Sequence, residues 1–315
     1  MKSLKLFLAG LLIPMPVWFA FNFTEAKLED FFVSQFYLSS QASSVWAETE
    51  IESATPSNLP IAPVIDAKSA LVLMIDSSGR QSIIFEQDSE QSQPIASLTK
   101  LMTAVIVFEN QSLSREIIIS PESVAQEGDS GNLKAGEKIS ISELLKMVLV
   151  ESSNDAAEAL AESYGKGDFI ALMNLKANGL GMGLTHFSNA TGLEAENNFS
   201  NAKDLATLSE SILKNYSVIF KISSRPSVAI MNKDGQLHHL ALNTNDLLSL
   251  GQPGNLEIVG GKTGYTQEAG GCIILVLKDQ EDNYFINVVL GANSPEARFL
   301  EMERLISWIQ SFNSQ

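Results

Sequence analysis

The chain has 315 residues, 45% of them hydrophobic and 18% charged, which is enough for one or two folded domains with a sizeable core. The net charge of −16 comes from acidic residues scattered along the chain, so the basic surface that nucleic-acid binding requires is excluded. The single cysteine, Cys272, excludes an intrachain disulfide and a cysteine-based metal site, and its place in the apolar run AGGCIILVL predicts a small buried side chain in a strand.

The beginning of the chain has the pattern of a targeting segment. Lys2 and Lys5 precede and enter an apolar stretch that ends at Phe23, which is typical of an export signal or a membrane anchor. We expect residues 1–26 to be a cleaved signal peptide or a retained N-terminal anchor, because about twenty apolar residues are just enough to span a bilayer. Both alternatives place the rest of the chain outside the cytoplasm.

Residues 27–65, rich in Ser, Glu, Ala and Pro, predict an extracytoplasmic linker, and residues 66–315 have the pattern of a folded domain. The apolar runs at 71–76 and 82–87 flank Ser-Ser-Gly and predict a β-hairpin. Helical patterns follow at residues 98–110, 141–150, 154–165, 169–182 and 201–216. Strand-like runs then lie at residues 256–264, 271–279 and 284–292, before a last helix at 297–312.

This order of elements predicts an α+β fold. The simplest arrangement joins the N-terminal and C-terminal strands in one antiparallel sheet, flanked by the first and last helices. The helices in the middle of the chain would form an inserted all-helical lobe. A functional site is expected in the cleft between the lobe and the sheet.

The segment PIASLTKLMTA places Ser97 and Lys100 three positions apart at the start of an apolar helix, so both lie on one helical face. A serine hydroxyl becomes a nucleophile when a base takes its proton, and a lysine amine can be that base when its surroundings lower its pKa. Backbone N–H groups at a helix N-terminus can also hold an oxyanion. The same S-x-x-K spacing begins at Ser163, Ser200 and Ser211. The motif alone therefore leaves open a plain role for Ser97 as a helix N-cap.

Lys262, Thr263 and Gly264 form the only K-[ST]-G motif of the chain, on a predicted strand. There the amine and the hydroxyl can hold a carboxylate of a substrate, and the glycine lets a substrate backbone approach closely. A phosphate-binding loop is excluded because residue 256 is Leu instead of the first glycine of that motif, and because no helix follows.

A third motif, S-x-N, has two competing candidates. Ser152 and Asn154 open a predicted helix directly after an apolar run, whereas Ser130 and Asn132 lie in the glycine-containing loop EGDSGNLKAGE. We favour Ser152 and Asn154, because a helix start fixes side-chain geometry better than a loop.

In this order, the motifs S-x-x-K, S-x-N and K-T-G resemble those of the penicillin-binding proteins and serine β-lactamases. The closer resemblance is to the serine-type D-alanyl-D-alanine carboxypeptidases, a family with segments similar to VESSNDAAEALAE, FSNATGL, NFSNAKDLA and GGKTGYTQEAGGC. It runs from about Ala67 to the last helix. It implies the two-lobed fold described above, a serine peptidase domain over residues 66–315, and an acyl-enzyme mechanism.

The resemblance also implies a catalytic role for three residues. Ser97 would attack the terminal D-Ala-D-Ala bond of a peptidoglycan stem peptide. Lys100 would be the base for acylation, a role that is disputed within the superfamily. Ser152 would relay a proton to the leaving D-alanine, and water would then release the acyl group without a metal or a cofactor.

The remaining motif residues would bind the substrate. By the same resemblance, Asn154 would orient the lysine or the substrate amide, and Lys262 and Thr263 would bind the terminal carboxylate beside Gly264. The backbone N–H of Tyr265 would complete an oxyanion hole with that of the nucleophile. The implied partners are peptidoglycan stem peptides, β-lactam antibiotics as inhibitors, and the bacterial membrane through the N-terminal segment.

One departure from a common plan of the family concerns attachment. The chain stops soon after the last predicted helix, so it is expected to lack the extra β-rich domain and amphipathic tail that many members use at the membrane. The N-terminal apolar segment is expected to replace that anchor, with the peptidase domain in the extracytoplasmic bacterial cell envelope.

Three other functions share these residues. A serine β-lactamase uses a glutamate, and an asparagine four positions later, to activate the deacylating water, and Glu194 and Asn198 have that spacing. The alternative is a polar turn before a helix. A D,D-endopeptidase of peptidoglycan crosslinks would differ only in the shape of the cleft. A non-catalytic peptidoglycan-binding protein would need a defect that the motifs do not show.

Two further motifs are interpreted as having no catalytic role. G-D-S-G at residues 128–131 spells the nucleophile motif of chymotrypsin-like proteases, but those have a histidine upstream of the serine, and His186, His238 and His239 all lie downstream. The last two histidines are adjacent and would point to opposite faces of a strand, so no metal-binding pair is expected.

Overall fold

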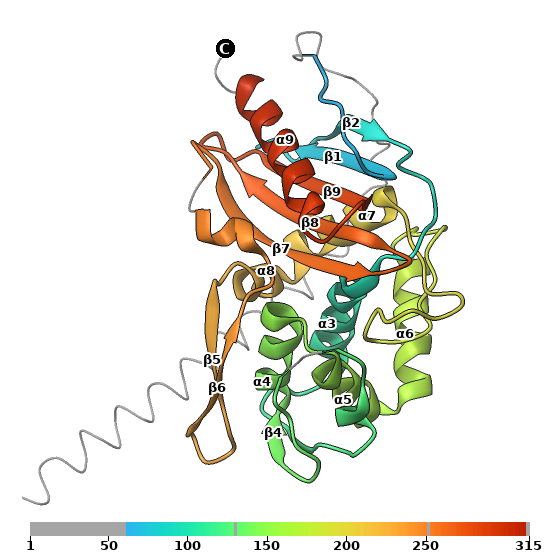
Figure 1. Cartoon of the computed structure of the whole chain (residues 1–315), viewed down its shortest axis with the longest axis vertical. Helices are drawn as coiled ribbons and strands as arrows, with labels where there is room; N and C mark the ends of the chain where they lie inside the picture. Colours follow the sequence, from blue (N-terminus) through green and yellow to red (C-terminus); the bar gives the residue numbers. More distant parts are fainter. Residues whose placement is uncertain (1–60, 129–130, 251–252, 313–315) are drawn as a thin grey trace, which may run out of the picture. The chain divides into compact units, whose positions relative to one another are not determined.

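The computed structural model describes residues 61–128, 131–250 and 253–312 (Figure 1). The chain divides into two compact units, Met1–Glu50 and Ile51–Gln315, and every described residue belongs to the second. The predicted signal or anchor at 1–26 lies outside the described residues, as does the linker as far as residue 60. Within the described part of the chain, no helix combines the length and hydrophobicity needed to cross a bilayer.

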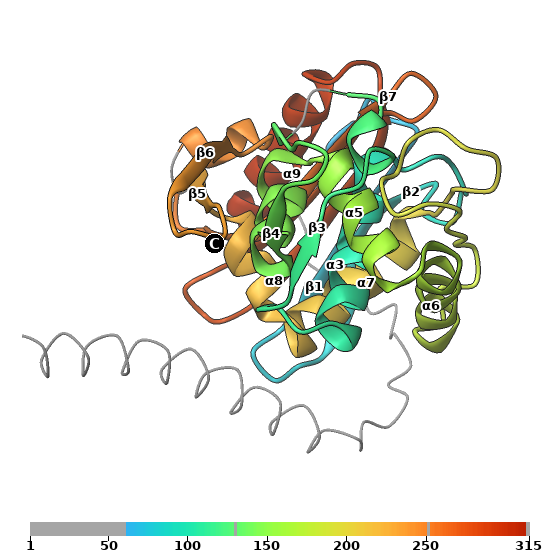
Figure 2. The same ribbon diagram turned by 90° about the horizontal axis from the view of Figure 1, so that it is seen from below.

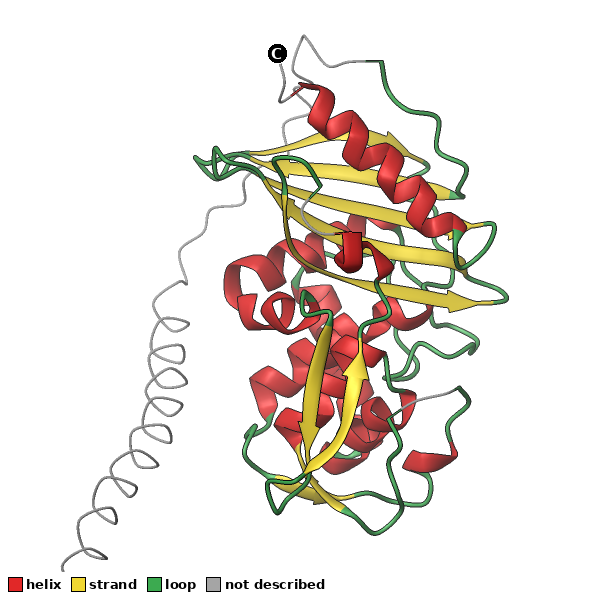
Figure 3. Cartoon of the chain, turned by 60° about the vertical axis from the view of Figure 1, so that its left-hand side comes forward, coloured by secondary structure: helices red, strands yellow, loops and turns green. Residues whose placement is uncertain are grey.

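The sheet has five antiparallel strands in the order β2-β1-β9-β8-β7 (Figures 1 and 3). Its strands are β1 (Ser69–Ile75), β2 (Gln81–Gln87), β7 (Glu257–Thr266), β8 (Gly270–Lys278) and β9 (Tyr284–Ala292). β1 pairs with both β2 and β9, which joins the N-terminal hairpin to the C-terminal strands as predicted. The K-T-G motif lies on β7, at one edge of the sheet.

Helices cover both faces of this sheet. β8 is therefore buried on both sides, and its sequence is a continuous apolar run. Cys272, Ile274 and Val276 belong to one hydrophobic cluster, and Ile273 and Leu275 belong to the other. Cys272 is fully buried, as predicted, and burial raises the pKa of its thiol to about 11. A thiol in this environment is expected to be unreactive, so Cys272 has a structural role.

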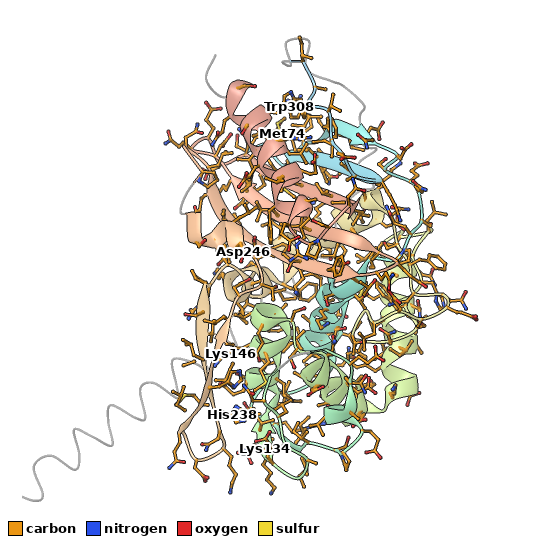
Figure 4. The ribbon with its side chains drawn as sticks, viewed as in Figure 1. Met74, Lys134, Lys146, His238, Asp246 and Trp308 are labelled. Carbon is orange, nitrogen blue, oxygen red and sulfur yellow. The ribbon has the colours of Figure 1, made fainter. Side chains whose placement is uncertain are left out.

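The last helix, α9 (Ala297–Phe312), packs on β8 and β9. Trp308 lies near its end (Figure 4). Its ring meets that of Phe85 edge-on, with centroids 5.9 Å apart. On the other face α7 (Ala202–Asn215) contacts β1 and β9, and α8 (Ser217–Ser223) contacts β7. The α+β class is confirmed, with one difference: α7 covers this face, whereas the first helix, α3 (Thr99–Asn110), runs into the lobe (Figure 2).

The lobe contains more than helices. Besides α3 it has α4 (Ile141–Lys146), α5 (Asn154–Tyr164) and α6 (Lys166–Gly179), with a 3-10 turn at Ser123–Ala125. A further 3-10 turn, Asp246–Leu250, leads to β7, and its Leu247 packs in the cluster between the sheet and α9. Two hairpins flank it, formed by β3 (Glu116–Ile118) with β4 (Lys138–Ser140), and by β5 (Ser227–Met231) with β6 (Leu237–Leu242). The helix predicted at 141–150 is α4 followed by a π-helix, Met147–Glu151. β3 and β4 have three residues each and the π-helix has five, so these elements are too short to give a periodic signal in the sequence.

Candidate active site

Ser97 lies in a single 3-10 turn, η1 (Ala96–Leu98), that leads directly into α3. The cap positions, Ile95 for η1 and Leu98 for α3, make no side-chain cap, so the alternative that Ser97 is an N-cap is wrong. Ala96 has φ of +48°, a left-handed conformation that residues with a Cβ rarely adopt. Such strain persists where the surrounding structure holds it, and it is common at functional sites.

Two glycines let neighbouring backbone press against this turn. A Cβ on Gly264 would lie 2.8 Å from the backbone nitrogen of Ser97, and a Cβ on Gly192 would lie 2.0 Å from the carbonyl oxygen of Ala96. Gly192 also has φ of +82°. The edge strand β7 and the turn at Gly192 therefore enclose the candidate nucleophile from two sides, and any larger residue at either position would displace it.

The structure brings Ser97, Lys100 and Asn154 together. Lys100 is fully buried. Its Nζ lies 2.9 Å from Ser97 Oγ, 2.6 Å from Asn154 Oδ1 and 2.5 Å from the carbonyl oxygen of Thr191. Burial, and secondly the charge of Lys262, hold the pKa of the Lys100 amine well below its usual value. The neutral amine that a general base requires is thus favoured by the site.

The partners of Lys100 also determine where its lone pair points. A neutral amine has two N–H groups and one lone pair. Asn154 Oδ1 and the Thr191 carbonyl can only accept hydrogen bonds, so they take both N–H groups. The lone pair then faces Ser97 Oγ, which has a proton to donate. This geometry suits removal of the serine proton.

A second lysine meets the S-x-N motif from the sheet. Lys262 Nζ lies 2.8 Å from Ser152 Oγ, and it also donates to the carbonyl of Thr263 at 3.0 Å. Burial, together with the nearby Arg298 guanidinium, lowers the pKa of Lys262 to about 7. Ser152 follows the π-helix and has φ of +64°, so an irregular turn directs its hydroxyl toward Lys262 on β7.

The next two residues of that motif start α5. Ser153 is the N-cap, and its hydroxyl accepts the backbone N–H of Ala156 at 3.1 Å. Asn154 donates from Nδ2 to the carbonyl of Glu127 at 2.6 Å while its Oδ1 faces Lys100. The competing residue Ser130 lies outside the described residues, and Asn132 has a left-handed φ of +52°.

The rest of β7 presents a hydroxyl and an exposed ring. Thr263 is buried, and its Oγ1 lies 2.6 Å from Oγ1 of Thr244. Arg298, from α9, donates to the carbonyl of Gly264 at 2.9 Å, which fixes the strand beside η1. The Tyr265 side chain is 48% exposed, so it borders the site without being part of the buried cluster.

Three of these residues were missed from the sequence. Thr191 contributes only a backbone carbonyl, although its segment FSNATGL was among those that carried the resemblance. Thr244 and Arg298 belong to no motif, and they reach β7 from a loop and from the last helix. No sequence pattern would have identified them.

The β-lactamase pair does not converge on the serine. Glu194 is exposed, and its carboxylate accepts the backbone N–H of Glu268 at 2.9 Å, at the turn between β7 and β8. The amide of Asn198 donates to Asn189 Oδ1 at 3.4 Å. These contacts favour the alternative interpretation of this segment as a polar turn.

The prediction that His238 and His239 point to opposite faces is wrong. Their Nδ1 atoms lie 2.7 Å apart, because His238 is an extra residue between the paired positions Ile230–His239 and Met231–Leu237. A β-bulge of this kind turns two successive side chains to one side. The described residues nevertheless contain no group of three or more His, Cys, Asp or Glu side chains placed to hold a metal ion.

Comparison with known proteins gives consistent matches. The family model described as D-alanyl-D-alanine carboxypeptidase matches residues 56–294. D-alanyl-D-alanine carboxypeptidase DacF of Bacillus subtilis is 31% identical over 250 residues, which cover 77% of this chain and 62% of the relative. A D-alanyl-D-alanine endopeptidase of Pseudomonas aeruginosa is 31% identical over 80% of both chains.

Solved structures agree. A D-alanyl-D-alanine carboxypeptidase from Mycobacterium tuberculosis superposes with a TM-score of 0.72 at 25% identity, over 82% of this chain and 96% of that one. A penicillin-binding protein from Listeria monocytogenes, solved in an ampicillin-bound form, gives 0.64 at 31% identity over 78% and 97%. The chain spans about 62% of the length of the first curated carboxypeptidases that it matches. With a family model that covers most of its length, the chain belongs to the D-alanyl-D-alanine carboxypeptidase family.

Proposed function

We propose that this protein is a serine-type D-alanyl-D-alanine carboxypeptidase that removes the terminal D-alanine from peptidoglycan stem peptides through an acyl-enzyme on Ser97. One observation carries the proposal. The Lys100 amine is fully buried, and its Nζ lies 2.9 Å from Ser97 Oγ, 2.6 Å from Asn154 Oδ1 and 2.5 Å from the carbonyl oxygen of Thr191. Family membership supports the substrate class.

Acylation would begin as Lys100 takes the proton of Ser97 while the hydroxyl oxygen attacks the carbonyl carbon of the D-Ala-D-Ala bond. The developing oxyanion would be held by the backbone N–H groups of Ser97 and Tyr265, which belong to two adjacent segments, η1 and β7. Ser152 would pass on to the leaving D-alanine the proton that Lys100 took from Ser97, and the contact of its hydroxyl with Lys262 Nζ at 2.8 Å would hold that hydroxyl in place.

Binding and release would use the same groups. Lys262 and Thr263 would hold the terminal carboxylate of the substrate, and Asn154 would keep Lys100 oriented. When the leaving group has taken its proton, Lys100 is neutral again and would activate the water that hydrolyses the ester. β-Lactams would acylate Ser97 as substrate mimics. Residues 1–26 would attach the domain to the outer face of the bacterial membrane or direct its secretion.

A second candidate function has its own support. The chain covers 80% of the length of the endopeptidase from Pseudomonas aeruginosa, against 62% for the first carboxypeptidases. A D,D-endopeptidase would cut crosslinked stem peptides with the same residues. Incubation with crosslinked and uncrosslinked muropeptides, followed by chromatography of the products, separates the two functions: free D-alanine marks a carboxypeptidase, and loss of crosslinked dimers marks an endopeptidase.

The proposed role of Lys262 predicts a selective loss of substrates. Changing Lys262→Ala should lower kcat/KM by about a hundredfold or more for a peptide with a free terminal carboxylate, because a charge-assisted contact is removed from a buried site. Steady-state kinetics on this peptide and on its C-terminal amide provide the check. An equal loss for both would refute carboxylate binding by Lys262.

The two lysines also predict a bell-shaped pH profile for kcat/KM. The rising limb reports Lys100 losing its proton, since only the neutral amine is a base. The falling limb, near pH 7 in the free enzyme, reports Lys262, because its cationic form is present below a pKa of about 7 and is lost above it. With the amidated peptide the falling limb should disappear, and its persistence would assign it to another group.

A further inference from the structure

We infer that Asn189 is a positioning residue for Lys100, acting through the backbone of the turn at residues 189–193. The inference rests on the proposed function of Lys100 as the base. Within the described part of the chain, Asn189 makes no hydrogen bond to Lys100 or Ser97, and its partners are Thr191, Gly192, Leu193 and Asn198. It fixes the carbonyl that takes one of the two N–H groups of the amine.

Both polar atoms of the Asn189 side-chain amide form hydrogen bonds with this turn. Its Oδ1 accepts the backbone N–H of Gly192 at 2.7 Å and the hydroxyl of Thr191 at 3.2 Å. Its Nδ2 donates to the carbonyl of Leu193 at 3.0 Å. An asparagine that bonds to backbone a few residues ahead closes an Asx-type turn. Three successive residues are therefore held by one side chain.

The turn is attached to α3 at two consecutive carbonyls. The hydroxyl of Thr103 donates to the carbonyl of Ala190 at 2.7 Å, and Lys100 donates to the carbonyl of Thr191 at 2.5 Å. Both donors are buried and lie three residues apart on α3, on one face of the helix. At Gly192 the turn also meets the backbone of Ala96, beside Ser97. The turn therefore touches the nucleophile segment and the base together.

The position of the Thr191 carbonyl matters because it decides which atom of Lys100 faces the serine. If the carbonyl moves away, the amine can turn an N–H toward Ser97 Oγ instead. An amine in that orientation donates to the serine and cannot take its proton. A loosened turn would also let water reach the amine and stabilise its ammonium form.

The test is the pH dependence of acylation in the full-length chain. Changing Asn189→Ala should lower the second-order rate constant for acylation by benzylpenicillin about tenfold to a hundredfold, the size of effect that misplacing a reacting group produces. The rising limb of the pH profile should also move to higher pH. Thr103→Val, which removes only the hydroxyl at almost constant volume, should change both quantities in the same direction and serves if Asn189→Ala does not fold.

Asn232 provides the matched control. It closes a similar turn at the tip of the β5–β6 hairpin, accepting the backbone N–H groups of Asp234 and Gln236 at 3.0 and 2.9 Å. Asn232→Ala should leave both the rate and the limb unchanged.

If Asn189→Ala folds and acylates at the wild-type rate, the inference is wrong. It is also wrong if acylation is slower but the rising limb of the pH profile does not move. In both cases the proposed function stands. A wild-type chain that penicillin does not acylate at Ser97 would refute the proposed function, and the inference with it.

Discussion

Changing Ser97→Ala is expected to abolish covalent labelling by penicillin and to lower D-alanine release by about 10⁴-fold or more, as for other serine hydrolases that lose their nucleophile. The reason is chemical: alanine leaves Lys100 with no hydroxyl to deprotonate, and no other described hydroxyl donates to or accepts from that amine. The measurement is intact mass after incubation with benzylpenicillin, with peptide mapping of any adduct.

Ser163 is the matched control, because it begins a second S-x-x-K motif. There the hydroxyl donates to Gln111 and to the carbonyl of Leu160, while Lys166 forms an ion pair with Glu158. Ser163→Ala should acylate at the wild-type rate. An adduct of unchanged yield on Ser97→Ala would show that the nucleophile is another residue.

Changing Lys100→Met is expected to slow acylation about 10²- to 10⁴-fold while leaving Ser97 in place, because general base catalysis contributes that much. Methionine fills most of the volume of the lysine but cannot take a proton. The residual rate would measure what the oxyanion hole and binding contribute alone. Stopped-flow or quenched labelling with a chromogenic β-lactam gives the rate constant, and Lys166→Met gives the control within the second S-x-x-K motif.

The same substitution has a consequence for stability. It removes the donor that Lys100 supplies to the carbonyl of the buried Thr191, and the loss of a partner by a buried acceptor costs about 1–3 kcal/mol. Thermal unfolding should therefore show a destabilised but folded variant. Acylation at the wild-type rate by such a variant would remove Lys100 from the mechanism.

The sequence allowed the sheet and most helices to be predicted because each has a clear period. β1 and β2 flank a turn signal, and β7, β8 and β9 are apolar runs separated by polar ones. The three motifs were assigned to a cleft because they lie on elements that an antiparallel sheet and an inserted lobe bring together. The contacts of Lys100 with Ser97 and Asn154, and of Lys262 with Ser152, agree with that assignment.

The remaining features depend on backbone geometry that side-chain patterns do not encode. The π-helix before Ser152, the left-handed Ala96 and the bulge at His238 each change the chain over one to five residues. The Thr191 carbonyl is a main-chain group, which any residue type supplies. Arg298 reaches Gly264 from a helix whose sequence carries no motif. Such contacts follow from packing once the fold is known.

The role of Ser97 as the nucleophile of a carboxypeptidase is decided by the release of D-alanine from a synthetic stem peptide ending in D-Ala-D-Ala, followed over time with and without prior exposure of the full-length protein to penicillin. We expect one D-alanine per peptide, and loss of this activity in proportion to the fraction of Ser97 that carries the antibiotic. Rapid hydrolysis of the penicillin with no release of D-alanine would refute the carboxypeptidase function and identify a β-lactamase.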